Sequence, residues 1–232
     1  MSKGLIIWNS VILLLITKVC LYAQDRPEIQ ELMPKQFIDK VEIIAGPSLM
    51  LPYGSAYIDS MLRVKIGYSV GLGLIHSLSK RLEMQCRVLW EGKGYKQEQL
   101  WGAGSYVHRF TANTTNNYIT ISVVPRYYVG KENRFHICSG AFYGRLMHSS
   151  TKEALYYSNG KMSYSTNPHS QYISNWDAGV SVGGGYSLTS FKGKELLIQA
   201  QGNFSIVNIE DNNSIITKYN SIMLTLMLKF YK

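Results

Sequence analysis

The sequence predicts an all-β protein, an eight-stranded antiparallel up-and-down transmembrane β-barrel. Three observations lead to this prediction. Apolar and polar residues alternate with period two along most of the chain. The alternating segments run about 10–15 residues, longer than the roughly 5–6 residues common in soluble sheets. The connections between them alternate between short and long, as in outer-membrane barrels.

The composition excludes several other classes of protein. Of the 232 residues, 46% are hydrophobic and 17% are charged, with 20 Gly and 6 Pro. These values argue against a disordered chain, a collagen-like chain and a coiled coil. The formal net charge of +9 is spread along the chain, so it does not by itself indicate nucleic-acid binding, and we expect none.

The N-terminus has the layout of a secretory signal peptide over residues 1–23. Lys3 gives a positive start, an apolar stretch follows, and cleavage fits after Ala23. An uncleaved membrane anchor is the alternative, although Lys18 interrupts the apolar run. A lipoprotein would be lipidated at Cys20, but Lys18 and Val19 are unfavourable residues before a lipidated cysteine. We therefore expect export to the bacterial outer membrane.

The exported chain divides into a polar leader over residues 24–40 and a barrel domain over 41–232. The last strand shows the pattern best, with Ile222 and Leu224 on one face and Ser221 and Met223 on the other. No stretch after residue 23 is apolar for the roughly 18–20 residues of a spanning helix. The expected strands are 41–50, 62–76, 80–91, 118–129, 134–147, 174–188, 195–207 and 218–231.

The connections predict which end of the barrel faces the periplasm. The even number of strands returns the C-terminus to the side where the chain begins. Short turns at 77–79, 130–133 and 189–194 are expected on that side. Longer loops are expected at the other end, at 51–61, 92–117, 149–173 and 208–217.

Charged residues in mid-strand point to a filled lumen. In a soluble sandwich this face would simply be solvated, and a lipocalin-like barrel would need an apolar lumen instead. In a closed eight-stranded barrel the same face becomes an interior just wide enough to be filled by side chains. Buried charges must then pair. The predicted lumen charge network comprises Glu42, Arg63, Lys65, Glu83, Arg87 and Arg126.

The cysteines, histidines and glycines suggest no cofactor and no metal. The alternation places Cys86 outside and Cys138 inside, so we expect two free thiols. No pair of His or Cys has zinc spacing. The glycine runs at Gly71 and Gly183 lack the strand–turn–helix context of a nucleotide loop. They are strand glycines, which either make room for long inward side chains or bend the sheet.

The chain resembles the PorT-like outer-membrane β-barrels. This resemblance implies an outer-membrane location, and a few relatives take part in protein secretion. Trp90, where the family more often has Tyr, and Lys232, after the terminal aromatic pair, depart from the pattern. The residues that carry the resemblance are 67–73, 82–85, 89–94, 118–121, 124–128, 138–144, 177–185 and the C-terminal strand.

No residues indicate a reaction. Some outer-membrane barrels modify lipid with His and Ser, and His148 with Glu153 is the pair we would test first. However, neighbours on a strand point to opposite faces, which places the adjacent His–Ser pairs of this chain poorly for catalysis. We expect no enzyme.

The expected role is therefore structural or interactive, through the extracellular loops or the periplasmic rim. The alternatives are a component of a protein-secretion apparatus and a narrow channel or small-ligand carrier. Expected partners are outer-membrane lipid and lipopolysaccharide, with other envelope or secretion proteins as further candidates. The long loops mix aromatic and basic residues, which suits such contacts, but mobile solvated loops remain the favoured description of them.

Overall fold

The computed structural model describes residues 39–54, 62–100, 106–130, 132–167, 174–191, 193–208 and 217–231. The predicted signal peptide and nearly all of the leader lie outside these residues. No helix among them is long and apolar enough to cross a membrane. The strands are β1 (Lys40–Gly54), β2 (Leu62–Arg63), β3 (Lys65–Ser77), β4 (Leu82–Leu100), β5 (Val107–Val129), β6 (Phe135–Tyr157), β7 (Met162–Asn167), β8 (Trp176–Phe191), β9 (Lys194–Ser205) and β10 (Thr217–Tyr231).

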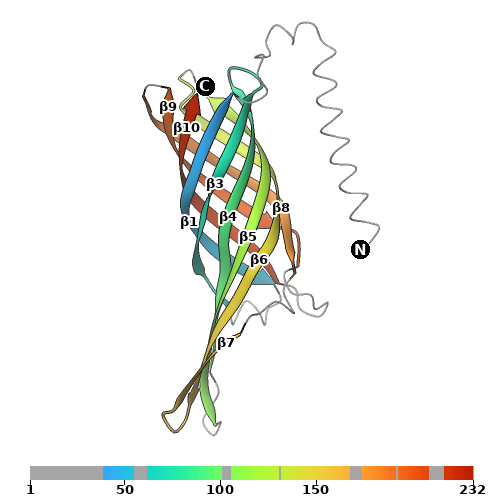
Figure 1. The fold of residues 1–232 in the computed structure, drawn as a ribbon, viewed down its shortest axis with the longest axis vertical. Coiled ribbons are helices and arrows are strands. Elements are labelled where there is room, and N and C mark those ends of the chain that lie inside the picture. The colour runs from blue at the N-terminus through green and yellow to red at the C-terminus, as the bar shows by residue number, and fades with distance from the viewer. Residues whose placement is uncertain are drawn as a thin grey trace, which may run out of the picture. The chain divides into compact units, whose positions relative to one another are not determined.

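Eight of these strands form a closed antiparallel ring. The order β4-β3-β1-β10-β9-β8-β6-β5 is closed by pairing of β4 with β5. The first and last strands of the ring pair from Lys40 opposite Tyr231 onwards. The strands of the ring are tilted, so that the strands of the front wall and those of the back wall run in different directions in the view (Figure 1). The predicted fold class is thus confirmed, with β2 and β7 as additions outside the ring.

The two faces of the ring are chemically opposite. Along β10, Ile222, Leu224 and Leu226 are each about half exposed, while Met223 and Thr225 between them are buried. The exposed side chains of the ring are mainly branched apolar residues, which suit contact with lipid. The inward side chains are mainly polar. Because a strand alternates with period two, a shift in pairing by one residue would turn the apolar side chains inward and the polar ones outward. The requirement that apolar side chains face outward therefore restricts the register of every strand.

The two cysteines follow the same rule. Cys86 is exposed on the outer face of β4, and Cys138 is buried on the inner face of β6. Both thiols are free, as the alternation predicted.

Aromatic side chains mark both edges of the apolar band. Trp176 and Tyr186 lie on the outer face of β8 near its two ends, and Trp176 stacks on Tyr143 of β6 with 6.3 Å between ring centroids. Ten residues separate Trp176 from Tyr186. At ~3.3 Å per residue and a tilt of ~40°, this separation spans roughly 25 Å across the membrane, the height of the apolar band of an outer-membrane barrel.

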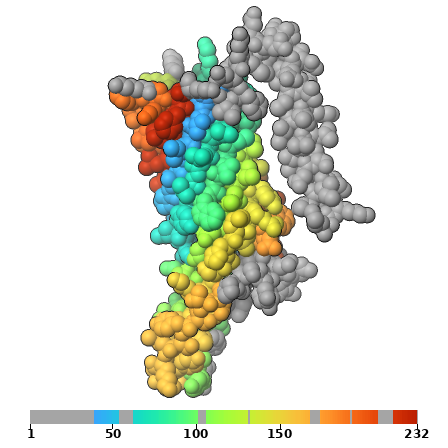
Figure 2. Space-filling view, viewed as in Figure 1, coloured from blue at the N-terminus to red at the C-terminus, as the bar shows by residue number. Residues whose placement is uncertain are grey.

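The structure corrects two of the predicted loops. Most of 92–117 and 149–173 is not loop, because β4 continues to Leu100, β5 begins at Val107, and β6 continues to Tyr157 before pairing with β7. These parts extend beyond the ring as a narrow projection at the end away from the C-terminus (Figures 1 and 2). Their backbone groups pair with each other, whereas a loop would leave them to water.

We call this projection the distal sheet. It has the strand order β2-β4-β5-β6-β7, and its members are residues 62–63, 93–100, 107–117, 148–157 and 162–167. A register shift between Asn117 and Tyr118 marks its junction with the ring.

Candidate functional site: a sealed lumen and a distal sheet

The lumen near Lys40 and Tyr231 holds a buried ionic cluster centred on Arg126. Its Nη1 lies 2.8 Å from Glu42 Oε1 and 3.6 Å from Glu83 Oε2. Its Nη2 donates to Gln85 Oε1 at 3.2 Å, and the Gln85 amide in turn donates to the second oxygen of Glu42. Both Arg126 and Glu42 are fully buried. We call this group, with the lysines described next, the basal cluster.

Two lysines complete the basal cluster. Lys229 Nζ lies 3.0 Å from Glu83 Oε1 and 3.2 Å from Glu195 Oε2, and it also donates to Tyr128 Oη at 2.8 Å. Lys40 Nζ lies 2.5 Å from Glu83 Oε1. The charges of the basal cluster therefore balance, because it contains as many carboxylates as cations. The carboxylates are Glu42, Glu83 and Glu195, and the cations are Arg126, Lys229 and Lys40. A balanced and hydrogen-bonded set is what burial of charge requires.

A second cluster lies in the lumen toward the distal sheet. Lys93 Nζ contacts Asp177 Oδ2 at 2.8 Å and Glu91 Oε2 at 3.4 Å. Ser205 donates to the other Asp177 oxygen at 2.6 Å, and Thr120 donates to Glu91. All five of these residues are buried. We call this group the upper cluster.

Arg87 extends into the interior with amide partners instead of carboxylates. Its Nη1 donates to Gln201 Oε1 at 2.7 Å and its Nη2 to Gln199 Oε1 at 3.2 Å. The Gln199 amide donates to Gln201, and the Gln201 amide donates to Asn203. This ladder along β9 turns its carbonyl oxygens toward the guanidinium. Its charged neighbours are Arg126 and Glu42 of the basal cluster.

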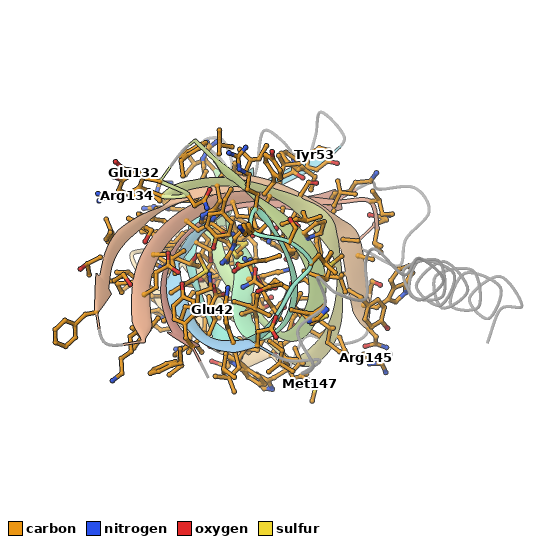
Figure 3. All side chains as sticks on the ribbon, turned by 90° about the horizontal axis from the view of Figure 1, so that it is seen from above. Glu42, Tyr53, Glu132, Arg134, Arg145 and Met147 are labelled. Atoms are coloured by element: carbon orange, nitrogen blue, oxygen red, sulfur yellow. The ribbon has the colours of Figure 1, made fainter. Side chains whose placement is uncertain are left out.

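Aromatic and amide groups fill the lumen where the ring meets the distal sheet. Tyr219 is buried and packs against Tyr95, at 6.4 Å between ring centroids, and against Leu146. Asn116 donates to Tyr219 Oη at 3.0 Å and accepts from Ser149 at 2.7 Å. Viewed along the barrel, side chains fill the ring, with Glu42 inside and Arg145 and Met147 outside (Figure 3).

The structure brings together four of the six residues of the predicted lumen network. Glu42, Glu83, Arg87 and Arg126 are buried and face the interior. The other two, which lie on the distal side, are described next.

Lys65 is only half-buried and donates to Thr114 O at 2.7 Å and Thr115 Oγ1 at 2.6 Å. Partial burial, together with the nearby charge of Lys96, lowers the pKa of Lys65. Arg63 differs from the prediction more strongly. It is exposed in β2, because the strand breaks at Val64 and Arg63 pairs with Lys96 in the distal sheet.

Sequence reasoning missed six charged members of the lumen, one of which is Lys40, assigned to the predicted leader. Asp177 and Lys229 stand on polar faces that the alternation had already identified. Lys93 was passed over because the predicted strand ended at residue 91. Glu91 and Glu195 were passed over because each is the terminal residue of a predicted strand. Extending each strand until its alternation fails, and including its terminal residues, would have found them.

The inward glycines serve two purposes. A β-carbon added at Gly71 would lie 2.1 Å from the carbonyl oxygen of Val88 on the neighbouring strand, so this glycine permits close backbone approach. A β-carbon at Gly73 would meet the Gln85 amide nitrogen at 3.2 Å. Gly73 therefore makes room for a member of the basal cluster, which is one of the two explanations considered for the strand glycines, whereas the close approach at Gly71 is a different role from the predicted bending of the sheet.

The described residues contain no grouping of three or more His, Cys, Asp or Glu able to hold a metal ion. His148 is exposed, while its neighbour Ser149 is buried and turned inward. Glu153 accepts from Asn167 at 3.1 Å and shares the inward face with Ser149. His148 and Glu153 thus lie on opposite faces of β6, which is not the arrangement of a nucleophile and its base.

A closed ring with a polar, filled lumen and an apolar outer face matches a known family. The model of the outer membrane protein beta-barrel domain matches residues 40–211. The chain belongs to this family. It is a protein of the bacterial outer membrane. Outer-membrane barrels have short periplasmic turns and longer extracellular segments, so we expect the distal sheet on the extracellular side.

Several solved structures resemble the chain at low identity. Ail of Yersinia pestis has 10% identity and a TM-score of 0.43, with 83% of this chain and 99% of that chain covered. The neisserial surface protein NspA has 14% identity and a TM-score of 0.41, with 83% and 97% covered. OprG of Pseudomonas aeruginosa has 10% identity and a TM-score of 0.41, with 85% and 98% covered. None of the curated proteins matches this chain.

Proposed function

We propose that this protein is a non-enzymatic, non-conducting outer-membrane barrel that acts as an interaction protein through its distal sheet. The observation that carries the proposal is the combination of a lumen filled by paired charges with an ordered sheet outside the membrane. The filled lumen leaves no path for a solute, and the ordered sheet provides a surface for a partner.

The burial of the lumen side chains supports a sealed barrel. A water-filled channel would hydrate the charged groups along it, yet Glu42, Arg126 and Asn116 have no exposed surface, and Lys93 has 2%. Moving an ion through this region would require breaking several charge pairs at once. Each buried ion costs several kcal/mol when it loses its partner.

The distal sheet supports a role in recognition. Ordered strands hold side chains in fixed positions more precisely than loops do. Here two hairpins and a short strand share one sheet, so residues distant in sequence form a single surface. The exposed aromatic residues Tyr106 and Tyr164 and the exposed cations of this sheet provide groups that are common in interfaces.

A role in protein secretion, within a PorT-like subgroup, is the second candidate. The resemblance of the sequence to PorT-like barrels favours it, as does β7. This strand pairs only with β6 within the sheet, all six of its residues are exposed, and it contains neither charge nor proline. Edge strands that lack such protection accept an added strand from a partner. Co-purification of other envelope proteins, lost on substitution of Tyr164 by Pro, would support this candidate.

Planar-bilayer recording tests the sealed barrel directly. The purified full-length protein, inserted into bilayers in 1 M KCl, should leave the baseline conductance unchanged. The matched variant is Arg126→Ala with Glu42→Ala, which empties part of the basal cluster and should raise the frequency of small openings. Stable unit conductance from the wild-type protein would contradict the proposal and favour a narrow channel.

A further inference from the structure

The outward face of the distal sheet carries a row of cations. Arg63 on β2 lies opposite Lys96 on β4, Lys96 lies opposite Asn113 on β5, and Asn113 lies opposite Lys152 on β6. These four positions therefore form one line across four neighbouring strands. All four residues are exposed. We call them the cationic row.

Within the part of the chain that the structure describes, the cationic row has no neutralising partner. Among the residues that the structure describes, no carboxylate lies within ion-pair distance of Arg63, Lys96 or Lys152. By contrast, the neighbouring Arg109 is paired with Glu98 at 2.6 Å on the same sheet. Like charges directly opposite each other on paired strands are destabilising. An anion between Arg63 and Lys96 would turn this repulsion into attraction.

The spacing of the row suits more than one anionic group. Neighbouring strands lie about 4.8 Å apart, so Lys96 and Lys152, two strands apart, are separated by roughly 10 Å at the backbone. Asn113 fills the gap with an amide that can donate a hydrogen bond without adding charge. Phosphate groups accept charge-assisted hydrogen bonds from both guanidinium and ammonium donors. A saccharide carrying phosphates at more than one position matches this pattern.

The location of the row indicates which anions it meets. Paired residues share a face, and the alternation of β4 places Lys96 on the same side as the lipid-facing Trp90. Six residues separate Trp90 from Lys96. At ~3.3 Å per residue and a tilt of ~40°, the row stands about 15 Å beyond the aromatic edge of the apolar band. It faces sideways over the membrane, at the height of lipid head groups and their attached sugars.

We infer that the cationic row binds the phosphorylated saccharide head groups of lipopolysaccharide in the outer leaflet around the barrel. This inference rests on the proposed function and names the partner of the distal sheet. The row anchors the projecting sheet to the surrounding leaflet by charge, so the binding weakens as ionic strength rises.

Calorimetric titration of the purified full-length protein in dodecyl maltoside micelles tests the inference. The probe is purified rough lipopolysaccharide, with and without removal of its phosphates by hydrofluoric acid. We expect the intact form to bind at least tenfold more tightly than the dephosphorylated form, and binding to weaken between 50 and 200 mM NaCl. Equal binding of the two forms would overturn the inference.

Two charge-matched variants locate the site. The variant Arg63→Gln, Lys96→Gln, Lys152→Gln should lose at least tenfold in affinity for intact lipopolysaccharide. The control Lys80→Gln, Arg81→Gln, Arg134→Gln removes the same charge from the periplasmic end and should change the affinity less than twofold. Unchanged mobility on unheated gels verifies that both variants are folded. Equal losses in the two variants would overturn the assignment to the row.

A soluble sulfated polysaccharide distinguishes binding to the lipid leaflet from binding to any soluble polyanion. Dextran sulfate should bind the wild-type protein more weakly than lipopolysaccharide does, and tighter binding of dextran sulfate would overturn the assignment to the leaflet. These outcomes are independent of the conductance of the barrel. A conducting wild-type barrel would refute the sealed lumen while leaving the cationic row intact. A non-conducting barrel that binds intact and dephosphorylated lipopolysaccharide equally would refute the cationic row while leaving the sealed lumen intact.

Discussion

The lumen and the distal sheet use the same residue types in opposite ways. Facing the lumen, the buried residues Arg126, Lys93 and Lys229 each lie within 3.2 Å of a carboxylate oxygen. On the distal sheet, Lys96 and Lys152 face solvent with no carboxylate partner among the described residues. The cost of burial explains the difference, because an unpaired ion inside the barrel is expensive and an unpaired ion in water is not.

This comparison separates structural charges from charges available for binding. The ions of the basal and upper clusters are paired with each other, so they stabilise the barrel. The exposed ions Arg63, Lys96 and Lys152 have no ion-pair partner among the described residues, so they can meet a ligand. We therefore assign the lumen to structure and the distal sheet to interaction.

The largest effect is expected from breaking the basal cluster. Arg126→Met would leave Glu42 buried without its ion-pair partner and Glu83 with one cation fewer. Removing one partner of a buried pair typically costs about 3–5 kcal/mol. We expect a loss of this size in the free energy of unfolding, measured by urea titration of the barrel refolded into lipid vesicles.

Two further variants sharpen that measurement. Adding Glu42→Gln to Arg126→Met removes the orphaned carboxylate and should restore part of the lost stability. Arg87→Met should cost less than Arg126→Met, since the partners of Arg87 are neutral amides that can bond with each other. Equal losses for Arg87→Met and Arg126→Met would argue against charge pairing as the main reason for the stability of the lumen.

A small effect is expected from the ion pair of the distal sheet. Arg109 lies 2.6 Å from Glu98, and its guanidinium lies 5.5 Å from the centre of the Tyr156 ring. Both charged side chains are more than two-fifths exposed, so solvent screens their attraction. Arg109→Ala should lower the free energy of unfolding by no more than about 1 kcal/mol in the same titration. A loss as large as that of Arg126→Met would mean that the distal sheet is part of the stabilising core.

The sequence predicted the ring well because one face of each strand meets lipid. Where Ile222 alternates with Met223 and Thr225, the pattern permits a single register. The distal sheet has polar side chains on both faces, as in the run from Asn113 to Asn116, so hydrophobic periodicity carries no signal there. One local signal was present but not used. Asn159-Gly160 is a strong hairpin dipeptide, and Gly160 has the positive φ of 78° that such a turn requires.

The pairing inside the lumen was only partly accessible from the sequence. The alternation assigns a residue such as Glu83 to the interior but does not specify which interior residues are level with it. That depends on the stagger of the strands around the ring, which brings Lys229 to Glu83 across 146 positions of sequence. The position of Arg63 could not be obtained from alternation either, because the break at Val64 reverses the face of the residues before it.

Lysine acetylation of the folded barrel tests the central comparison most directly. Lys93 and Lys96 lie three residues apart on β4, yet one is buried in the upper cluster and the other is exposed in the cationic row. In lipid vesicles, a brief treatment with a water-soluble acetylating reagent, followed by mass spectrometry, should modify Lys96 and Lys152 and spare Lys93 and Lys229. All four should react after unfolding in urea. Modification of Lys93 or Lys229 in the folded barrel at the rate of Lys96 would contradict a sealed and paired lumen.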